Sequence, residues 1–505
     1  MKTNNKIKVW MLAASTVLLC SCEFSLDKMP DNRSELDSKA KVSQLLVSAY
    51  PTCTFIQMAE LMSDNTIDQG KLYNFRSIIV EQSYKWQDIT EKSQDSRVYL
   101  WNNYYRAIAS ANHALQYINS AKDKNSMAAQ KAEALLCRAY SHFILVNMFC
   151  QHYNEVTSKT DLGIPYAETP ETQVLVNYPR ETVAAVYEKI NRDIEEALPL
   201  ISDSEYNSAA IKYHFNQNAA YAFAARFNLF YQKYDKVIQY ATHVLGNDPQ
   251  KMLRDYNLYT AVPSAPEVGT AYIKEDQSCN LLLIPAKTSW PRTLASGSAN
   301  SKYTFNFSTL TTPGPWGSLN NLTLSRFLYK NGEQNNFIPK LTEFFEYTDQ
   351  VAGIGYINII SAAFCADETL LCRAEAYVMK NDFTNATADL TTWYNARTES
   401  NVTPLTEAYI EQFYSAAPEK ICPAINPKFE VTAGKQLNFI KCVLHFRRVE
   451  TIHEGLRWFD IKRYGIEVSH PFSDGTTDVL TKDDLRRAVQ IPSEVITAGM
   501  IPNPR

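Results

Sequence analysis

The stretch Leu370-Leu-Cys-Arg-Ala-Glu-Ala-Tyr377, followed by the polar turn Lys380-Asn-Asp-Phe383, decides how this chain folds. From 363 to 397, apolar and small residues recur at helical spacing on both sides of that turn. Arg373 stands in the middle of the first apolar segment. The pattern predicts two helices joined by a short turn, with small residues in the second helix that allow close packing.

The same plan occurs earlier in the chain. Residues 219–245 predict an apolar helix with a central Arg226, a turn at Tyr231-Gln-Lys-Tyr-Asp-Lys236, and a second helix. Three further segments have helical spacing: 101–118, 131–150 and 183–198. Helix hairpins that cover one another's apolar faces are typical of tetratricopeptide arrays. We therefore predict a mainly α fold, a tetratricopeptide-like helix-hairpin array with a loop-rich insertion.

The loop-rich insertion spans residues 246–362. Pro, Gly, Ser, Thr and Asn accumulate there, as in Thr311-Thr-Pro-Gly-Pro-Trp-Gly317, and aromatic residues stand among them. Long irregular segments in compact proteins tend to carry function. We expect four regions: 1–21 as a signal peptide, 22–245 as an N-terminal helical region, 246–362 as a candidate ligand-binding insertion, and 363–505 as a C-terminal region.

Composition excludes several classes of protein. Apolar residues make up 45% of the 505 residues and charged residues 21%, so the chain can bury a large core. There are 50 Lys and Arg against 54 Asp and Glu. This balance provides no basic surface for nucleic acid or for an anionic membrane. Eight cysteines follow Cys22 without the spacing of a disulfide scaffold, and we expect mostly buried free thiols.

The N-terminus predicts export and a lipid anchor. Lys2, Lys6 and Lys8 precede an apolar run over 9–19, which is too short to span a bilayer. The run ends in Leu19-Cys-Ser-Cys22, which resembles a bacterial lipobox. We expect cleavage before Cys22 and acylation (palmitate) of its sulfur. The alternative is an ordinary secretory signal that is cut elsewhere, with Cys22 as a plain thiol.

Local motifs for catalysis and metal binding are missing. The closest two of the eight histidines are eight residues apart, so no H-E-x-x-H or other local zinc pair can form. G-x-S-x-G, G-x-x-x-x-G-K-[ST] and G-x-G-x-x-G are also missing. We expect that the protein has no cofactor, no metal site and no enzymatic activity. A glycosidase that uses carboxylates from distant parts of the chain stays open.

Several blocks of the sequence follow one another in a specific order. They are Cys22-Glu-Phe-Ser-Leu-Asp-Lys-Met-Pro30, Leu136-Cys-Arg-Ala-Tyr140, Leu162-Gly-Ile-Pro165, Arg180-Glu-Thr-Val183 with Tyr187-Glu-Lys-Ile190, Leu370-Leu-Cys-Arg-Ala-Glu-Ala-Tyr377, Glu454-Gly-Leu-Arg-Trp-Phe-Asp-Ile-Lys-Arg463, Gln490-Ile-Pro492 and Asn503-Pro504. Together they resemble the SusD/RagB family of outer-membrane nutrient-binding lipoproteins over about the whole mature chain. The usual Gly-Tyr ending of that family is missing, and Arg505 closes the chain.

The charged residues of these blocks have a structural interpretation. Glu454, Arg457, Asp460 and Arg463 lie at helical spacings. We expect them to form an ion-paired helix that stabilises the C-terminal fold, in preference to contacting a ligand. Arg373 of the opening stretch and its neighbour Glu375 are interpreted in the same way.

The resemblance implies a role in polysaccharide utilisation. Family members lie on the cell surface as a lid over a SusC-like TonB-dependent barrel and capture oligosaccharides, or in some branches peptides. Their tetratricopeptide face contacts the barrel, and loops on the other side carry the ligand site. The resemblance therefore implies an outer-membrane, lipid-anchored, surface-exposed protein that delivers its ligand to a transporter.

Ligand residues are expected in an early loop and in the insertion, because relatives build their aromatic platform there. Sugar rings stack on aromatic faces, and their hydroxyls need planar polar partners. The expected ligand-binding residues are Trp290, Trp316, Tyr303, Tyr73, Trp86, Asp64 and Asn65. Trp290 and Trp316 rank highest because they lie in loops beside Pro and Gly, and their joint replacement by Ala is expected to abolish glycan binding with little change in melting temperature. The alternative for each ring is burial in a local core.

Three other hypotheses about the function remain open. The cargo can be an oligopeptide, in which case backbone hydrogen bonds and mixed pockets replace an aromatic arc. The chain can be a lipid-anchored scaffold that uses its helices for protein contacts only. It can also be a hydrolase, which the missing motifs disfavour.

Overall fold

Three long helices form the first part of the array. They are α5 (Arg97–Ser120), α6 (Ala128–Phe149) and α7 (Val183–Ala197), close to the predicted bounds. The Ser96 hydroxyl caps α5 and the Thr182 hydroxyl caps α7 by accepting from backbone N–H groups of the first turn. Arg138 of α6 donates to Asp193 of α7, with 2.6 Å between Nε and Oδ2. This buried pair ties the two helices together.

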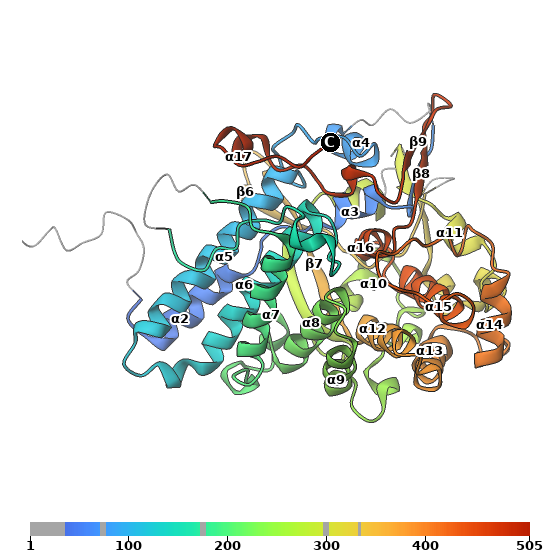
Figure 1. Cartoon of the computed structure of the whole chain (residues 1–505), viewed down its shortest axis with the longest axis horizontal. Helices are drawn as coiled ribbons and strands as arrows, with labels where there is room; N and C mark the ends of the chain where they lie inside the picture. Colours follow the sequence, from blue (N-terminus) through green and yellow to red (C-terminus); the bar gives the residue numbers. More distant parts are fainter. Residues whose placement is uncertain (1–35, 71–76, 172–177, 296–301, 332–334) are drawn as a thin grey trace, which may run out of the picture. The chain divides into compact units, whose positions relative to one another are not determined.

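The two predicted helix hairpins pack against each other although they are far apart in the sequence. The first is α8 (Gln217–Phe230) with α9 (Tyr234–Leu245), and the second is α12 (Ala366–Met379) with α13 (Phe383–Arg397). Figure 1 shows α9 and α12 side by side. The central arginines connect helices, because Arg226 pairs with Glu368 of α12 and Arg373 pairs with Asp389 of α13. The mainly α, tetratricopeptide-like fold is confirmed.

The remaining helices are shorter or lie towards the C-terminus. They are α2 (Lys39–Leu46), α3 (Ile56–Met62), α4 (Ile78–Tyr84), α10 (Ala265–Tyr272), α11 (Ser308–Thr311), α14 (Glu407–Ser415), α15 (Lys435–Glu450), α16 (Leu456–Arg463) and α17 (Ser493–Thr497). The expected ion-paired helix is α16, where Arg463 contacts Asp460 and Glu375. Arg457 contacts Asp64. These pairs confirm the structural interpretation of that motif.

The insertion contains a three-stranded antiparallel sheet in the order β2-β7-β6. Its strands are β2 (Asn280–Lys287), β6 (Phe344–Asp349) and β7 (Ile354–Cys365). The register runs from Asn280 opposite Cys365 to Lys287 opposite Asn358, so β2 ends before β7 does. The first residues of β7 therefore pair with β6 alone.

Three two-stranded sheets complete the strands of the described chain. They are β1 (Thr66–Asp68) with β3 (Tyr303–Phe305), β4 (Tyr329–Asn331) with β5 (Asn335–Phe337), and β8 (Val468–Pro471) with β9 (Thr477–Leu480). The β1–β3 pair joins the early region to the insertion, with Thr66 opposite Phe305. Two segments more than 200 residues apart in the sequence are thus held together by backbone hydrogen bonds.

The computed structural model describes residues 36–70, 77–171, 178–295, 302–331 and 335–505. The residues from Ser43 to Arg505 form one compact unit, separate from those before it. The division at 245/246 and 362/363 stays a prediction. Within the described ranges, no helix has the length and apolar character needed to cross a membrane. The eight cysteines from Cys53 to Cys442 are buried free thiols, as expected.

Candidate functional site

Trp290 lies in the protein core and not on an open platform. Its side chain is 0% exposed and packs in a cluster that includes Ile56 and Ile359. The indole Nε1 donates to the backbone oxygen of His453 at 3.2 Å. Because β2 enters the core, the turn that follows it carries Trp290 inwards as well. The expectation of an exposed stacking ring is wrong for Trp290.

Trp316 is enclosed by its own loop. It is 2% exposed, and its ring lies 4.8 Å from that of His445. Gly314 and Gly317 exchange backbone hydrogen bonds of 3.0 and 2.9 Å. A Cβ atom on Gly314 would lie 2.5 Å from the indole, so the loop packs directly against the ring. The Pro and Gly residues that suggested exposure instead build this tight turn, and the expectation is wrong for Trp316 too.

Trp86 and Tyr303 are also buried, against neighbours from other parts of the chain. Trp86 stacks on His470 with ring centres 4.1 Å apart, and its Nε1 donates to the Met62 oxygen at 2.9 Å. The ring centres of Tyr303 and Tyr84 are 4.6 Å apart. Neither ring offers a face to solvent, so these two expectations are corrected in the same way. Tyr73 and Cys22 lie outside the described residues.

Asp64 and Asn65 belong to a buried charge network. The Asp64 carboxylate accepts from Arg457 at 2.8 and 2.9 Å, and Asn65 Oδ1 accepts from Arg448 Nε at 2.9 Å. Burial alone would raise the pKa of the Asp64 carboxyl, but Arg448 and Arg457 outweigh it and hold that pKa well below its usual range. Asn65 Nδ2 also donates to Glu60 at 3.3 Å. Both side chains are committed to structure, so they are not open ligand groups.

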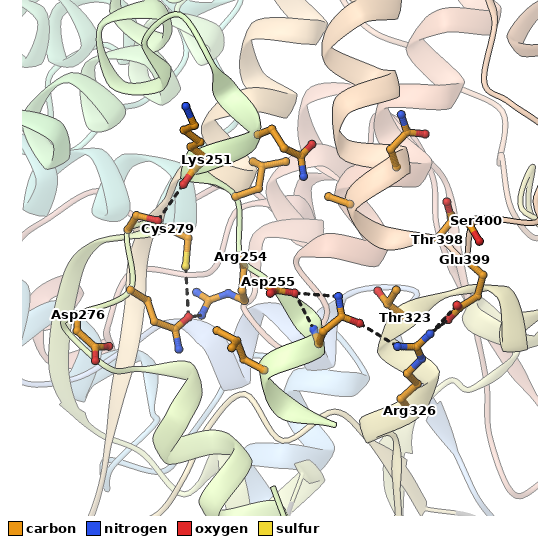
Figure 2. A pocket seen from close by; sticks show the side chains of 18 residues that line it. Lys251, Arg254, Asp255, Asp276, Cys279, Thr323, Arg326, Thr398, Glu399 and Ser400 are labelled. Carbon is orange, nitrogen blue, oxygen red and sulfur yellow. Dashed lines mark hydrogen bonds and ion pairs between the residues drawn. The ribbon is translucent and has the colours of Figure 1, made fainter. Parts of the chain in front are cut away.

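A polar groove of about 790 Å³ lies elsewhere on the insertion. Figure 2 shows its walls, which come from the segment after α9, from the turn before β2, and from the end of α13. The lining residues are Gln250, Lys251, Leu253, Arg254, Asp255, Asn257, Leu258, Asp276, Gln277, Ser278, Cys279, Thr323, Arg326, Asn395, Ala396, Thr398, Glu399 and Ser400. Most of them lie within 246–362, the region expected to bind ligand, and none is aromatic.

Arg254 forms the rigid floor of this groove. Its guanidinium donates to the Tyr272 oxygen at 2.7 Å, to Gln277 at 3.1 Å and to Asn280 at 2.6 Å. Its Nε has no hydrogen-bond partner among the described residues. Arg397 also donates to the backbone oxygen of Arg254 at 2.9 Å. Hydrogen bonds within the protein therefore fix the position of Arg254, and no ligand is needed to order it.

One wall of the groove carries a chain of planar polar groups. Arg326 donates to Asn257 Oδ1 at 2.9 Å and pairs with Glu399. Asn257 in turn donates to Asp255 Oδ1 through its backbone at 2.9 Å and its side chain at 3.0 Å. Figure 2 shows this row from Asp255 to Glu399. Guanidinium, amide and carboxylate groups in one row can donate to and accept from hydroxyls or peptide groups.

Other groups in the groove remain available for a ligand. Asp276 and Asn395 are exposed, and neither side chain makes a hydrogen bond with another described residue. The Cys279 thiol is different, because burial raises its pKa to about 11 and keeps it protonated at neutral pH. The groove therefore has the chemistry of a binding site. Ranking by aromatic residues missed it, although most of its lining lies in the segment whose sequence texture changes at 246.

The comparisons agree with this fold. Residues 24–229 match the family described as SusD-like, "Starch-binding associating with outer membrane". No curated protein matches the chain. A SusD superfamily protein from Bacteroides thetaiotaomicron is 18% identical, with a TM-score of 0.67 over 93% of this chain and 100% of that one. One from Bacteroides fragilis is also 18% identical, with a TM-score of 0.67 over 92% and 99%.

A laminarin-binding SusD-like protein has the same architecture. It is 16% identical to this chain, with a TM-score of 0.59 over 92% of this chain and 99% of that one. At such identities the structural likeness speaks for the fold, and the match over residues 24–229 adds the sequence evidence. Residues 24–229 are thus similar in sequence to the SusD-like family, and the whole chain has the fold of SusD superfamily proteins.

Proposed function

We propose that this protein binds oligosaccharides in the polar groove and is a capture protein without catalytic activity. The observation that carries the proposal is the groove itself, whose lining combines the unpaired side chains of Asp276 and Asn395 with the row of planar groups that ends at Glu399. Sugar hydroxyls need such planar donors and acceptors, and the volume lies in the range of small-molecule sites. The starch-binding description of the matched family supports the same class of ligand.

The transport role completes the proposal. We place the protein at the outer membrane, anchored through acylated Cys22, where it would pass its ligand to a SusC-like TonB-dependent transporter. Support comes from the outer-membrane association in the family's description and from the lipobox-like sequence. Cys22→Ala should release the protein from the membrane fraction, and continued retention would contradict the anchor. Co-purification with a large barrel protein tests the partner.

The groove is tested by calorimetry with laminari- and malto-oligosaccharides. Asp276→Ala combined with Asn395→Ala should weaken binding about tenfold or more, because each removes a hydrogen-bond partner. Asp483→Ala is the matched control, since Asp483 is exposed and makes no hydrogen bond to the described chain. Equal affinity in the double variant and the control would reject the groove as the binding site.

Oligopeptide cargo is the second candidate, and one observation favours it. The groove has no aromatic lining residue, and it combines Leu253 and Leu258 with charged groups. Mixed pockets of this kind suit a peptide, whose backbone also needs planar partners. Calorimetry with a peptide mixture separates the candidates, because binding of peptides without binding of any glycan would replace the first proposal by the second.

A further inference from the structure

The hairpin of β6 and β7 exposes more aromatic surface than Trp86, Trp290, Tyr303 and Trp316, the described rings of the predicted platform. Phe344, Tyr347 and Tyr356 are 40%, 55% and 41% exposed, and Val351 and Ile354 at its tip are more exposed still. An apolar patch of this kind marks an interaction site more often than a scattered single residue does. We call residues 344–357 the aromatic hairpin.

The aromatic hairpin is exposed because the sheet narrows there. β2 ends at Lys287, opposite Asn358, and the next residue, Thr288, still donates to the Ile357 oxygen at 3.1 Å. The residues of β7 before Ile357 have only β6 beside them. β6 is the edge strand. Among the described residues, none pairs with its outer side. Proteins normally protect an exposed edge strand against pairing with other chains, so an unprotected edge rich in aromatic residues suggests a binding role.

The two faces of the hairpin differ in their polar groups. Residues opposite each other in the register share a face, which places Phe344 with Asn358, and Tyr356 with Glu346. On the other face, Tyr347 lies opposite Gly355. We call the side with Phe344 and Tyr356 the first face and the side with Tyr347 the second face.

On the second face two charged groups form a bidentate pair. Arg292 and Glu343 form a two-bond pair beside Phe345, with 2.7 Å between Nε and Oε2. The Phe345 and Tyr347 rings pack edge to face at 4.8 Å. Arg292 and Glu343 are thus already bonded to each other on this face.

On the first face the polar groups are only loosely paired. Lys287 Nζ lies 3.6 Å from Glu346 Oε2 and 4.0 Å from the centre of the Tyr356 ring. Asn358 Nδ2 donates to Glu346 at 3.2 Å. An ammonium, an amide and a carboxylate thus lie in reach of two exposed rings. Such a set offers apolar faces to the C–H side of a sugar and planar partners to its hydroxyls.

We propose that the first face of the aromatic hairpin, built by Phe344, Tyr356, Glu346, Asn358 and Lys287, is a second glycan-binding site, separate from the groove. The inference takes its ligand class from the proposed function. β7 is 12 residues long, and its far end, Cys365, contacts Arg254 of the groove floor at 3.7 Å. Tyr356 and Asn358 lie nine and seven residues before Cys365, so the strand separates the two sites by roughly 23–31 Å. A long polysaccharide that reaches both sites gains affinity through effective concentration.

The test compares variants of the full-length protein in affinity electrophoresis with laminarin and with amylopectin. Tyr356→Ala and Phe344→Ala should each weaken polysaccharide binding about tenfold, the scale of one stacked ring. Tyr347→Ala is the matched control from the second face and should stay within about twofold of the wild type. Tyr356→Phe keeps the ring and should also bind normally. The four variants change three exposed positions, so melting temperatures should not change.

The outcomes separate this inference from the groove. If the Asp276→Ala and Asn395→Ala double variant loses binding while the Tyr356→Ala and Phe344→Ala variants bind as the wild type does, the hairpin site is wrong and the groove stands. The reverse result keeps the hairpin and rejects the groove. If Tyr347→Ala is as damaging as Tyr356→Ala, the hairpin is recognised as a whole, as by a docked protein strand, and the inference falls. If the wild type binds neither polysaccharide, the hairpin proposal is overturned, and peptide calorimetry then decides the cargo of the groove.

Discussion

Trp290 and Tyr347 both come from the loop-rich insertion, yet one is fully buried and the other is more than half exposed. Trp290 follows directly after β2, whose side chains enter the core, so the chain has no room to turn the ring outwards. Tyr347 lies on β6 beyond the point where β2 ends. The length of a neighbouring strand thus decides which aromatic residues meet solvent.

The three buried tryptophans that were expected to bind ligand share a second feature that the hairpin lacks. Trp86 packs on His470, Trp290 on His453 and Trp316 on His445. No histidine occurs among residues 344–357. The two aromatic regions should therefore differ in their response to substitution and to pH.

The largest expected effect is Trp290→Ala. It removes a fully buried ring and leaves a cavity in the cluster around Ile56 and Ile359, so it should lower the free energy of unfolding by about 3–5 kcal/mol. The measurement is urea unfolding, with the exposed Tyr347→Ala as control. A loss below 1 kcal/mol for Trp290→Ala would show that the ring is not part of the core.

The second-largest loss of stability is expected on acidification. Burial, with help from Arg448 for His445 and Lys340 for His453, lowers the pKa of both imidazoles to about 3. Between pH 6.5 and 3 the unfolded chain binds protons that the folded chain does not, so stability falls as pH drops through this window. When the pH is lowered from 7.5 to 5.5, these two histidines together should reduce the free energy of unfolding by about 3 kcal/mol. Urea unfolding at both values checks this, and His445→Phe should reduce the difference. Equal stability at both values, or the same difference in the variant, contradicts these assignments.

A smaller loss is expected for Gly314→Ala. The added methyl group would meet the Trp316 indole at 2.5 Å, so the loop must shift, at a cost of about 1–3 kcal/mol. Asn320→Ala is the control, because Asn320 is exposed in the same segment. Thermal unfolding of both variants measures the difference. An unchanged melting temperature for Gly314→Ala would mean that Trp316 can move out of its site.

The smallest effect on stability is expected at the aromatic hairpin. Tyr356→Ala removes an exposed ring with one ammonium contact, so the free energy of unfolding should change by less than about 0.5 kcal/mol. The same unfolding assay applies, and Tyr356→Phe serves as the reference. A loss above 1 kcal/mol would place Tyr356 in the folded core and weaken its assignment to a ligand.

Much of the scaffold could be predicted from local pattern. The spacing around Arg226 and Arg373 predicted both helix hairpins, and the charges of α16 were correctly assigned to ion pairs. The candidate site was predicted less well. The role of the insertion in ligand binding stays a prediction. Pro and Gly beside Trp316 suggested an open loop where the structure has a loop closed over the ring.

The sequence by itself determined the helices, because their periodicity and capping residues act within a few positions of each other. Only the tertiary structure decided which aromatic rings and polar groups are accessible. Exposure of Tyr347 and Tyr356 depends on where β2 stops, and the groove depends on Arg254 meeting the end of α13. Burial is set by contacts between residues far apart in the chain, and these contacts leave no local signature.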